Sequence, residues 1–237
     1  MKKVSVLLLS MTVISAGAAP SVLAQSGRGE SAFQIRVGGF FPEGGGEFWQ
    51  ESESVFTLDA SDFDGSTLGL SFVSSINNNL EVGINADFFE EEVTSFYRGE
   101  TEPIGHDTRL STVPLTVDLR FIPGGRFRQR SAGPVRKPVF YVGVGAGVNF
   151  WEYEEIGDFI DFSVEPNEVF FDRFREDGEA LQVHVMAGLE LPLSPGFNLT
   201  LEGRRSWADD NLAGDFAGLG DIELGGTSVF IGGSFRW

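Results

Sequence analysis

Two histidines are the side chains of this chain that can exchange a proton near neutral pH. His106 is followed directly by Asp107, and Ser111 stands a few residues further on. A hydrolase or acyltransferase needs a histidine that is oriented by an acid and placed against a nucleophilic hydroxyl. Neighbouring positions in the sequence do not create that geometry, and no catalytic motif of a lipid-modifying enzyme surrounds either histidine. We therefore expect no enzymatic activity and no cofactor, and we regard a lipid-modifying enzyme as the weakest alternative.

A larger set of polar residues stands at alternate positions within otherwise apolar segments. It holds five acids, four arginines and His184, in a chain whose net charge is -18. Charges that are taken out of water must be paired, so this near balance indicates an enclosed interior. We predict a polar cluster inside a barrel, formed by Arg36, Glu81, Asp87, Asp118, Arg120, His184, Glu190, Glu202, Arg204 and Arg236.

The elements that must position this cluster are eight segments of alternating hydrophobicity. Successive side chains of a strand point to opposite faces, so each segment presents one apolar face and one polar or small face. A strand of about ten such residues can cross a bilayer. The segments are 33–41, 66–76, 80–89, 111–121, 139–150, 180–191, 197–206 and 227–237. Pro114 has no N–H to donate, which predicts a bulge there or a position above the bilayer.

The connections alternate in length. Those at 77–79, 122–138 and 192–196 are short or of middling length, whereas 42–65, 90–110, 151–179 and 207–226 are long. This alternation is typical of up-and-down outer-membrane barrels, with the long loops outside and both chain ends on the periplasmic side. Part of the third long loop, 158–172, again alternates in hydrophobicity, which predicts a hairpin that continues the two flanking strands above the bilayer.

The apolar faces and the rims favour a membrane over water. A lipocalin-type soluble barrel is the main alternative, but its polar face would meet solvent, whereas here that face is rich in glycine. Aromatic residues gather where the segments end, as in the two girdles of membrane barrels. They include Phe41, Phe88, Phe150, Trp151 and Trp207 near the long loops and Phe33, Phe72, Phe121, Phe140, Phe235 and Trp237 near the short turns. The predicted fold is all-β, an eight-stranded antiparallel up-and-down transmembrane β-barrel.

Residues 1–24 have the pattern of a secretory signal peptide. Lys2 and Lys3 precede a short apolar run, and small residues precede Gln25. The run is shorter than the roughly 20 residues that a spanning helix needs. We expect export, a barrel domain over 25–237, and a location in the bacterial outer membrane.

The signal peptide, the eight amphipathic segments, the alternating loops and the final F-I-G-G-S-F-R-W together resemble the small outer-membrane β-barrel family that includes the OmpA membrane domain, OmpX and OmpW. In that family the terminal aromatic strand is similar to the signal that the barrel assembly machinery reads. The resemblance thus implies that Ile231, Phe235 and Trp237 form an assembly signal.

The resemblance is specific for the fold and poor for the function. We expect a structural or surface-interaction protein without catalysis; the alternative is a narrow, porin-like channel for small or hydrophobic solutes. The acidic loops could hold Ca²⁺ or Mg²⁺, although a solvated acidic surface is the simpler interpretation. Expected partners are outer-membrane lipid and the barrel assembly machinery. The acidity argues against nucleic acid, and we expect a monomer.

Overall fold

The computed structural model describes residues 30–237 apart from 101, 131–132 and 165–166. The predicted signal peptide, residues 1–24, lies outside the described residues. Within the described parts, no helix is long and apolar enough to cross a membrane.

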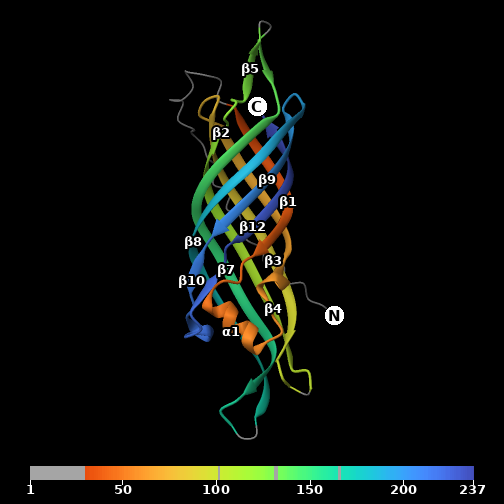
Figure 1. Cartoon of the computed structure of the whole chain (residues 1–237), viewed down its shortest axis with the longest axis vertical. Helices are drawn as coiled ribbons and strands as arrows, with labels where there is room; N and C mark the ends of the chain where they lie inside the picture. The colour runs from red at the N-terminus through yellow and green to blue at the C-terminus, as the bar shows by residue number, and fades with distance from the viewer. Residues whose placement is uncertain (1–29, 101, 131–132, 165–166) are drawn as a thin grey trace, which may run out of the picture.

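Eight antiparallel strands close into a barrel, as the sequence predicted (Figure 1). The first and last strands close it, with Phe33 opposite Phe235 and Val37 opposite Ile231. Each remaining strand pairs with its neighbours in the chain, which is the up-and-down order. The strands are β1 (Ser31–Pro42), β2 (Gly65–Ser75), β3 (Leu80–Phe96), β4 (Gly105–Phe121), β7 (Val139–Asp161), β8 (Glu168–Ser194), β9 (Phe197–Trp207) and β12 (Gly226–Arg236).

Four of the strands are longer than a bilayer requires. β3 with β4, and β7 with β8, continue beyond the barrel as two long hairpins, and the second pairs as far as Asp161 opposite Glu168. The predicted continuation of the flanking strands through 158–172 is therefore confirmed. We call this end of the molecule the long-loop end and the opposite one the short-turn end. In outer-membrane barrels the long loops face outward.

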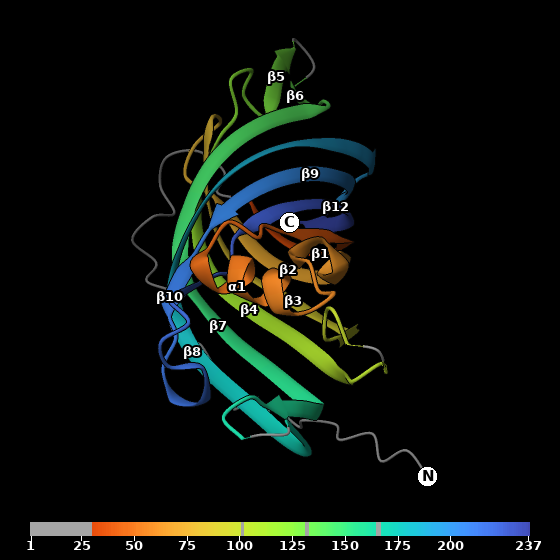
Figure 2. The ribbon, with the colours of Figure 1, turned by 60° about the horizontal axis from the view of Figure 1, so that its bottom comes forward.

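The remaining elements are short and lie at the two ends. At the short-turn end β5 (Phe127–Arg130) and β6 (Gly133–Arg136) form a separate hairpin. The long-loop end carries α1 (Glu47–Val55), the 3-10 turns η1 (Ala60–Phe63) and η2 (Gly214–Phe216), and the strand pair β10 (Asp209–Asn211) and β11 (Asp221–Glu223). Figure 2, in which this end is turned forward, shows α1 in front of the barrel strands.

The outer face of the barrel is apolar and exposed. Val117, Val144 and Ile231 are about half exposed although they lie in the middle of strands, which in a water-soluble protein would be unfavourable. Most of the predicted girdle residues are also exposed on this face. Trp151 is a correction, because it is 4% exposed and turns inward, where its Nε1 donates to Asp210 (2.9 Å).

Pro114 disturbs the sheet less than expected. Ala86 pairs with Leu115 and Phe89 with Thr112, so the register of β3 against β4 is the same on both sides of the proline. The β3–β4 ladder lacks only the pairs that lie between Ala86–Leu115 and Phe89–Thr112, because proline has no N–H to donate to the ladder. The predicted bulge is therefore wrong, and the alternative, a position of Pro114 above the bilayer, stays a prediction.

Candidate functional site

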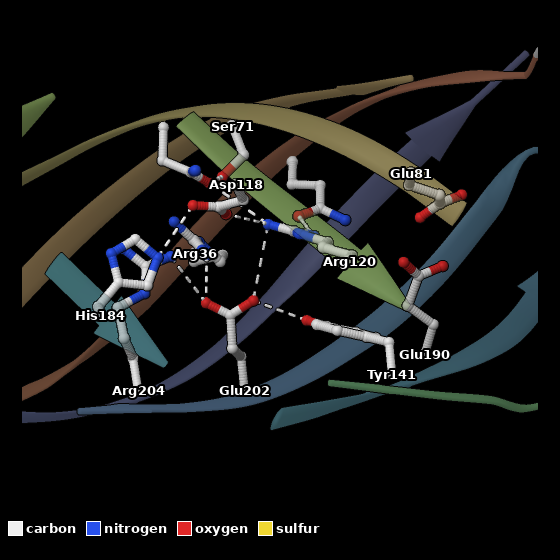
Figure 3. A network of polar contacts seen from close by, with 12 residues as sticks. Arg36, Ser71, Glu81, Asp118, Arg120, Tyr141, His184, Glu190, Glu202 and Arg204 are labelled. Carbon is white, nitrogen blue, oxygen red and sulfur yellow. Dashed lines mark hydrogen bonds and ion pairs between the residues drawn. The ribbon is translucent and has the colours of Figure 1, made fainter. Parts of the chain in front are cut away.

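The middle of the barrel is filled by a network of buried ion pairs (Figure 3). Glu202 on β9 accepts from Arg36 of β1 (2.5 Å) and from Arg204 on its own strand (3.0 Å). Both arginines also contact Asp87 of β3, at 3.0 and 2.6 Å. These side chains meet because their positions alternate with the lipid-facing ones, so all of them point into the lumen. The four form a closed ring of two acids and two bases.

A second set of contacts extends this ring toward β4 and β8. The Tyr141 hydroxyl donates to Glu202 (2.7 Å), and Arg120 lies 3.7 Å from the same carboxylate. Arg120 also contacts Asp118 (3.2 Å), which in turn lies 2.9 Å from Nε2 of His184. His184 is thus held by an acid but has no serine beside it among its hydrogen-bond partners.

Small residues make room for this network. A Cβ atom at Gly145 would lie 2.4 Å from the His184 ring and 2.5 Å from Asp118, and one at Gly188 would lie 2.3 Å from the Tyr141 ring. Such approaches are too close for any other residue without movement of the partner. These glycines are therefore needed for the long side chains beside them, as the glycine-rich polar face suggested.

Aromatic rings complete the lumen. Phe230 on β12 faces inward, and the guanidinium groups of Arg36 and Arg204 lie 4.8 and 5.8 Å from its ring centroid. Arg120 lies 5.2 Å from the Tyr141 centroid. These cation–π contacts stabilise arginines that have left bulk water.

A separate ring of charges closes the short-turn end. Arg126 contacts Glu81 (2.7 Å) and Glu190 (2.6 Å), and Arg236 contacts the same two acids at 2.9 and 3.2 Å. Sequence reasoning missed Arg126, because this residue lies in the connection 122–138 and not in one of the alternating segments. With it, the described residues place five acids and five arginines in the barrel interior, so the small imbalance in the predicted cluster disappears.

The turn itself carries Arg126 into the barrel. Gly125 adopts a positive φ of 64°, which reverses the chain. The backbone N–H of Arg126 then donates to the carbonyl of Asn78 (2.8 Å), and the next N–H donates to the Asn78 side chain (2.9 Å). The Gly-Gly pair that precedes an arginine beside a strand end was the available signal in the sequence.

Two cavities among the described residues of the barrel are small. One beside Asp87 and Arg204 measures about 20 Å³, and one beside Arg126 and Arg236 about 10 Å³. A cavity needs roughly 10–15 Å³ on this measure to hold one water molecule. These spaces accommodate isolated water molecules and no continuous column.

The long-loop end carries an apolar core that the sequence did not predict. We call it the aromatic cap: α1, η1, η2, β10 and β11 packed against the inward faces of the extended strands. Gly46 precedes the helix in extended conformation, and the helix buries one face while its acids point to solvent. The Trp49 Nε1 donates to the carbonyl of Glu223 (3.0 Å). The buried residues of the cap are Phe40, Phe48, Trp49, Leu58, Ala60, Phe63, Phe89, Leu110, Trp151, Tyr153, Ala180, Ala208, Leu212, Phe216, Ile222 and Leu224.

His106 belongs to this end and not to a catalytic triad. It faces inward and is 2% exposed, whereas Asp107 is exposed on the other face of β4 and bonds to Thr94 (2.6 Å). The His106 Nε2 lies 3.1 Å from the hydroxyl of Ser95, which is itself fully buried. No acid is within hydrogen-bond distance of the ring's Nδ1 among the described residues. Burial lowers the pKa of His106 to about 4, so the ring is neutral at pH 7.

Glu155 is an acid buried at the edge of the cap. It lies on β7 and is 5% exposed, and the Tyr153 hydroxyl donates to its Oε1 (2.7 Å). Burial raises the pKa of Glu155 to about 7, and the hydrogen bond from Tyr153 opposes that rise only in part. A carboxyl group that titrates near neutral pH is unusual and often marks a functional position.

The ten residues of the predicted interior cluster are all buried, and each takes part in one of the two charge networks described above. Ile231, Phe235 and Trp237 are exposed on the outer face, at the seam between β12 and its neighbours. Their role as an assembly signal stays a prediction. In the described parts of the chain, no group of three or more His, Asp or Glu side chains is arranged to hold a metal ion.

A closed eight-stranded barrel with an apolar belt and a charged, filled lumen defines this chain as an outer-membrane β-barrel protein. No family model and no curated protein sequence matches it. Solved structures that resemble it include outer membrane protein OprG of Pseudomonas aeruginosa, at 14% identity over 88% of this chain and 96% of that chain, with a TM-score of 0.49. A major outer membrane protein of Thermus thermophilus has 11% identity over 87% and 99%, also with a TM-score of 0.49. The attachment invasion locus protein Ail of Yersinia pestis has 12% identity over 88% and 99%, with a TM-score of 0.45.

Proposed function

We propose that this protein is a sealed outer-membrane barrel that neither conducts solutes nor catalyses a reaction, and that it serves as a rigid support for a folded, outward-facing cap that binds at the cell surface. The observation that carries this proposal is the filled lumen. Five arginines and five acids are paired within it, and the aromatic cap lies at the long-loop end.

A channel would have to cross both charge networks. At the short-turn end, Arg126 and Arg236 are each bound to two carboxylates, and removing either from its partners would leave buried charge unpaired. An eight-stranded barrel has an interior wide enough only for side chains. The geometry therefore favours a sealed barrel that supports the aromatic cap over a narrow channel.

The absence of catalysis is part of the proposal. Ser95 and His106 form a hydroxyl–histidine pair at the long-loop end; Ser95 is fully buried, and the His106 ring packs against Phe56 and Phe159. No acid orients His106 in the described chain, so the charge arrangement that activates a serine is missing.

The lipid profile of a strain that carries His106→Asn and His184→Asn should equal those of wild type and of a strain without the protein.

We further propose that the protein acts as a monomer and that its partners during assembly are outer-membrane lipid and the barrel assembly machinery. The exposed row Ile231, Phe235 and Trp237 on the final strand supports the second point. The two strands that meet at the seam are fully paired, so the wall of the barrel itself leaves no strand edge open for a second copy.

The test of the sealed lumen is electrical. Purified protein in a planar lipid bilayer should give no stepwise current at either polarity. An open porin in the same chamber serves as the positive control, and the faster gel mobility of the unboiled protein verifies that the barrel is folded. Reproducible current steps from the folded wild-type protein would overturn the proposal.

A further inference from the structure

An open cavity of about 250 Å³ lies between α1, η2 and the extended hairpin of β7 and β8. Pockets for drug-sized ligands begin at roughly 300 Å³. A cavity of slightly smaller volume suits an organic molecule smaller than a typical drug. The cavity is outside the charge networks of the lumen and lies between the aromatic cap and the extended hairpin. The proposed function leaves open what this end of the molecule binds, and the cavity offers an answer.

The walls of the cavity are aromatic. Five phenylalanines line it: Phe48 and Phe56 from the first long loop, Phe159 and Phe174 from the long hairpin, and Phe216 from η2. Several of these rings meet edge to face, for example Phe159 with Phe174 at 4.8 Å between centroids. Their faces present negative charge density, which attracts cations and favours apolar groups at the same time.

Every charged side chain that lines the cavity is an acid. Glu51 of α1 and Asp215 of η2 stand exposed at its rim, whereas Glu155 is buried at its inner wall. No lysine or arginine is among the lining residues. An anionic ligand would therefore meet only repulsion, and a neutral apolar ligand would leave the Glu155 carboxylate without a counter-charge.

The Glu155 carboxylate is only partly satisfied by hydrogen bonds within the described chain. Its Oε1 is bonded to Tyr153, but its second carboxylate oxygen has no hydrogen-bond or ion-pair partner in the described chain. On the two neighbouring strands the residues opposite Glu155 are Thr108 and Phe174, and neither carries charge. A buried carboxylate with one free oxygen and an aromatic enclosure is the arrangement by which proteins recognise ammonium groups.

We propose that this cavity is a binding site for a small organic ammonium ion, in which Glu155 supplies the counter-charge and the phenylalanine rings enclose the apolar substituents of the nitrogen. The inference rests on the proposed role of the outward-facing end as a binding surface, and it adds the chemical class of the ligand. A quaternary ammonium of the choline type fits the volume and a lining in which Ser52 is the one polar side chain besides the three carboxylates.

The binding should depend on pH through Glu155. Burial raises the pKa of Glu155 to about 7, so its carboxyl group is mostly neutral at pH 6 and mostly ionised at pH 8. The nearby acid Glu176 on β8 does not line the cavity, and its Oε1 accepts a hydrogen bond from the backbone N–H of Ala213 (2.5 Å). Affinity for the cation should therefore rise about tenfold from pH 6 to pH 8. The other titratable groups around the site are the phenols Tyr153 and Tyr97, the rim acids Glu51 and Asp215, and His106, which packs behind Phe56 and Phe159 and is neutral over this pH range.

The test compares two ligands that differ in charge alone. Isothermal titration calorimetry would measure the binding of choline and of its uncharged isostere 3,3-dimethylbutan-1-ol to the wild-type protein in dodecyl maltoside, a detergent without an ammonium group. We expect choline to bind at least tenfold more tightly at pH 8. Equal affinities for the two ligands, or no binding of choline, would overturn the assignment without any variant.

Matched variants locate the site. Glu155→Gln removes the charge and keeps the shape, and it should weaken choline binding at least tenfold and abolish the pH dependence. Phe174→Leu keeps the wall apolar but removes a ring face, and it should weaken binding severalfold. Glu179→Gln, which removes an exposed acid on the outer face of the same hairpin, should bind like wild type. Equal losses in Glu155→Gln and Glu179→Gln would overturn the site.

The electrical measurement on the same preparation keeps the two proposals apart. A protein that is silent in the bilayer but does not bind choline would refute the ammonium site and leave the sealed support intact. A protein that conducts but binds choline through Glu155 would refute the sealed support alone.

Discussion

The variant Glu202→Gln should lose about 3–5 kcal/mol of unfolding free energy, because it breaks a buried charge network by removing one partner. Glu202 is bound by Arg36 and Arg204 and lies near Arg120, while its second oxygen accepts from Tyr141. Glutamine keeps the shape but leaves three arginines with only two neighbouring acids in the middle of the barrel. The penalty comes from this excess of buried positive charge and not from one lost hydrogen bond.

Urea unfolding of the barrel in lipid vesicles, followed by the mobility of unboiled protein on a gel, would measure the loss. The matched control is Glu152→Gln, which also removes a carboxylate paired with two arginines. Glu152 is partly exposed on the outer face of β7, so its ion pairs with Arg109 and Arg175 should contribute less than about 1 kcal/mol. Similar losses in the two variants would show that burial is not the source of the effect.

The effects of replacing Arg36 and Glu202 on the unfolding free energy should not be additive. Arg36→Met combined with Glu202→Gln removes one positive and one negative charge, and Arg204 can still pair with Asp87. The double variant should therefore be less destabilised than the sum of the two single variants, with a coupling of about 1–3 kcal/mol. Strict additivity would contradict a shared network.

The stability of the aromatic cap should respond to pH in opposite directions when Glu155 and His106 are replaced separately. The pKa of Glu155 is raised from 4.5 to about 7, so the folded state holds its proton over that range and stability is lost as pH rises through it. The pKa of His106 is lowered from 6.5 to about 4, so the unfolded state takes up the proton first and stability is lost as pH falls through that range.

The two effects overlap and nearly cancel in the wild-type protein between pH 4.5 and 6.5. Each of the two groups contributes about 3 kcal/mol over its full range, because a tenfold change in proton affinity corresponds to about 1.4 kcal/mol. Glu155→Gln should therefore leave a cap that becomes less stable as the pH falls. His106→Phe, which keeps an aromatic ring against Phe159, should leave one that becomes less stable as the pH rises.

Hydrogen exchange of backbone amides in α1 would report the local opening of the cap at each pH. The exchange rates of each variant are compared with those of wild type at the same pH. The many exposed acids affect both proteins equally, so their contribution cancels in the difference. The double variant should again show the weak pH dependence of wild type. If both single variants keep the wild-type slope, the two groups do not titrate as their burial implies.

The barrel was predictable because alternation is a property of each strand alone. Val142, Val144 and Val148 on one face of β7 and glycines on the other follow directly from the two-residue period, and eight such segments with alternating loop lengths leave one topology. The closing pair of β1 and β12 followed from the rule that a sheet edge is not left open in lipid.

The cap was not predictable in the same way, because its segments lack a repeating pattern and its buried residues come from parts of the chain that are far apart in sequence. The segment 42–65 was interpreted as an acidic loop. Phe48, Trp49 and Ser52 nevertheless fall on one face of a helix, at spacings of three and four residues, and were the available signal. Arg126 escaped because the direction of a turn depends on a glycine conformation that composition does not reveal. Glu155 was counted with the solvated acids because its burial depends on the neighbouring strands.

The position of the cap also affects how fast the barrel can open. Residues that follow β1 contact residues that precede β12: the backbone of Glu43 donates to Gly225 (3.0 Å), and Gly45 and Trp49 both bond to Glu223. The seam between β1 and β12 is thus bridged a second time beyond the barrel, at the long-loop end. Separation of β1 from β12 requires the cap to break in the same event, so the cap should lengthen the lifetime of the closed barrel by slowing its unfolding rate.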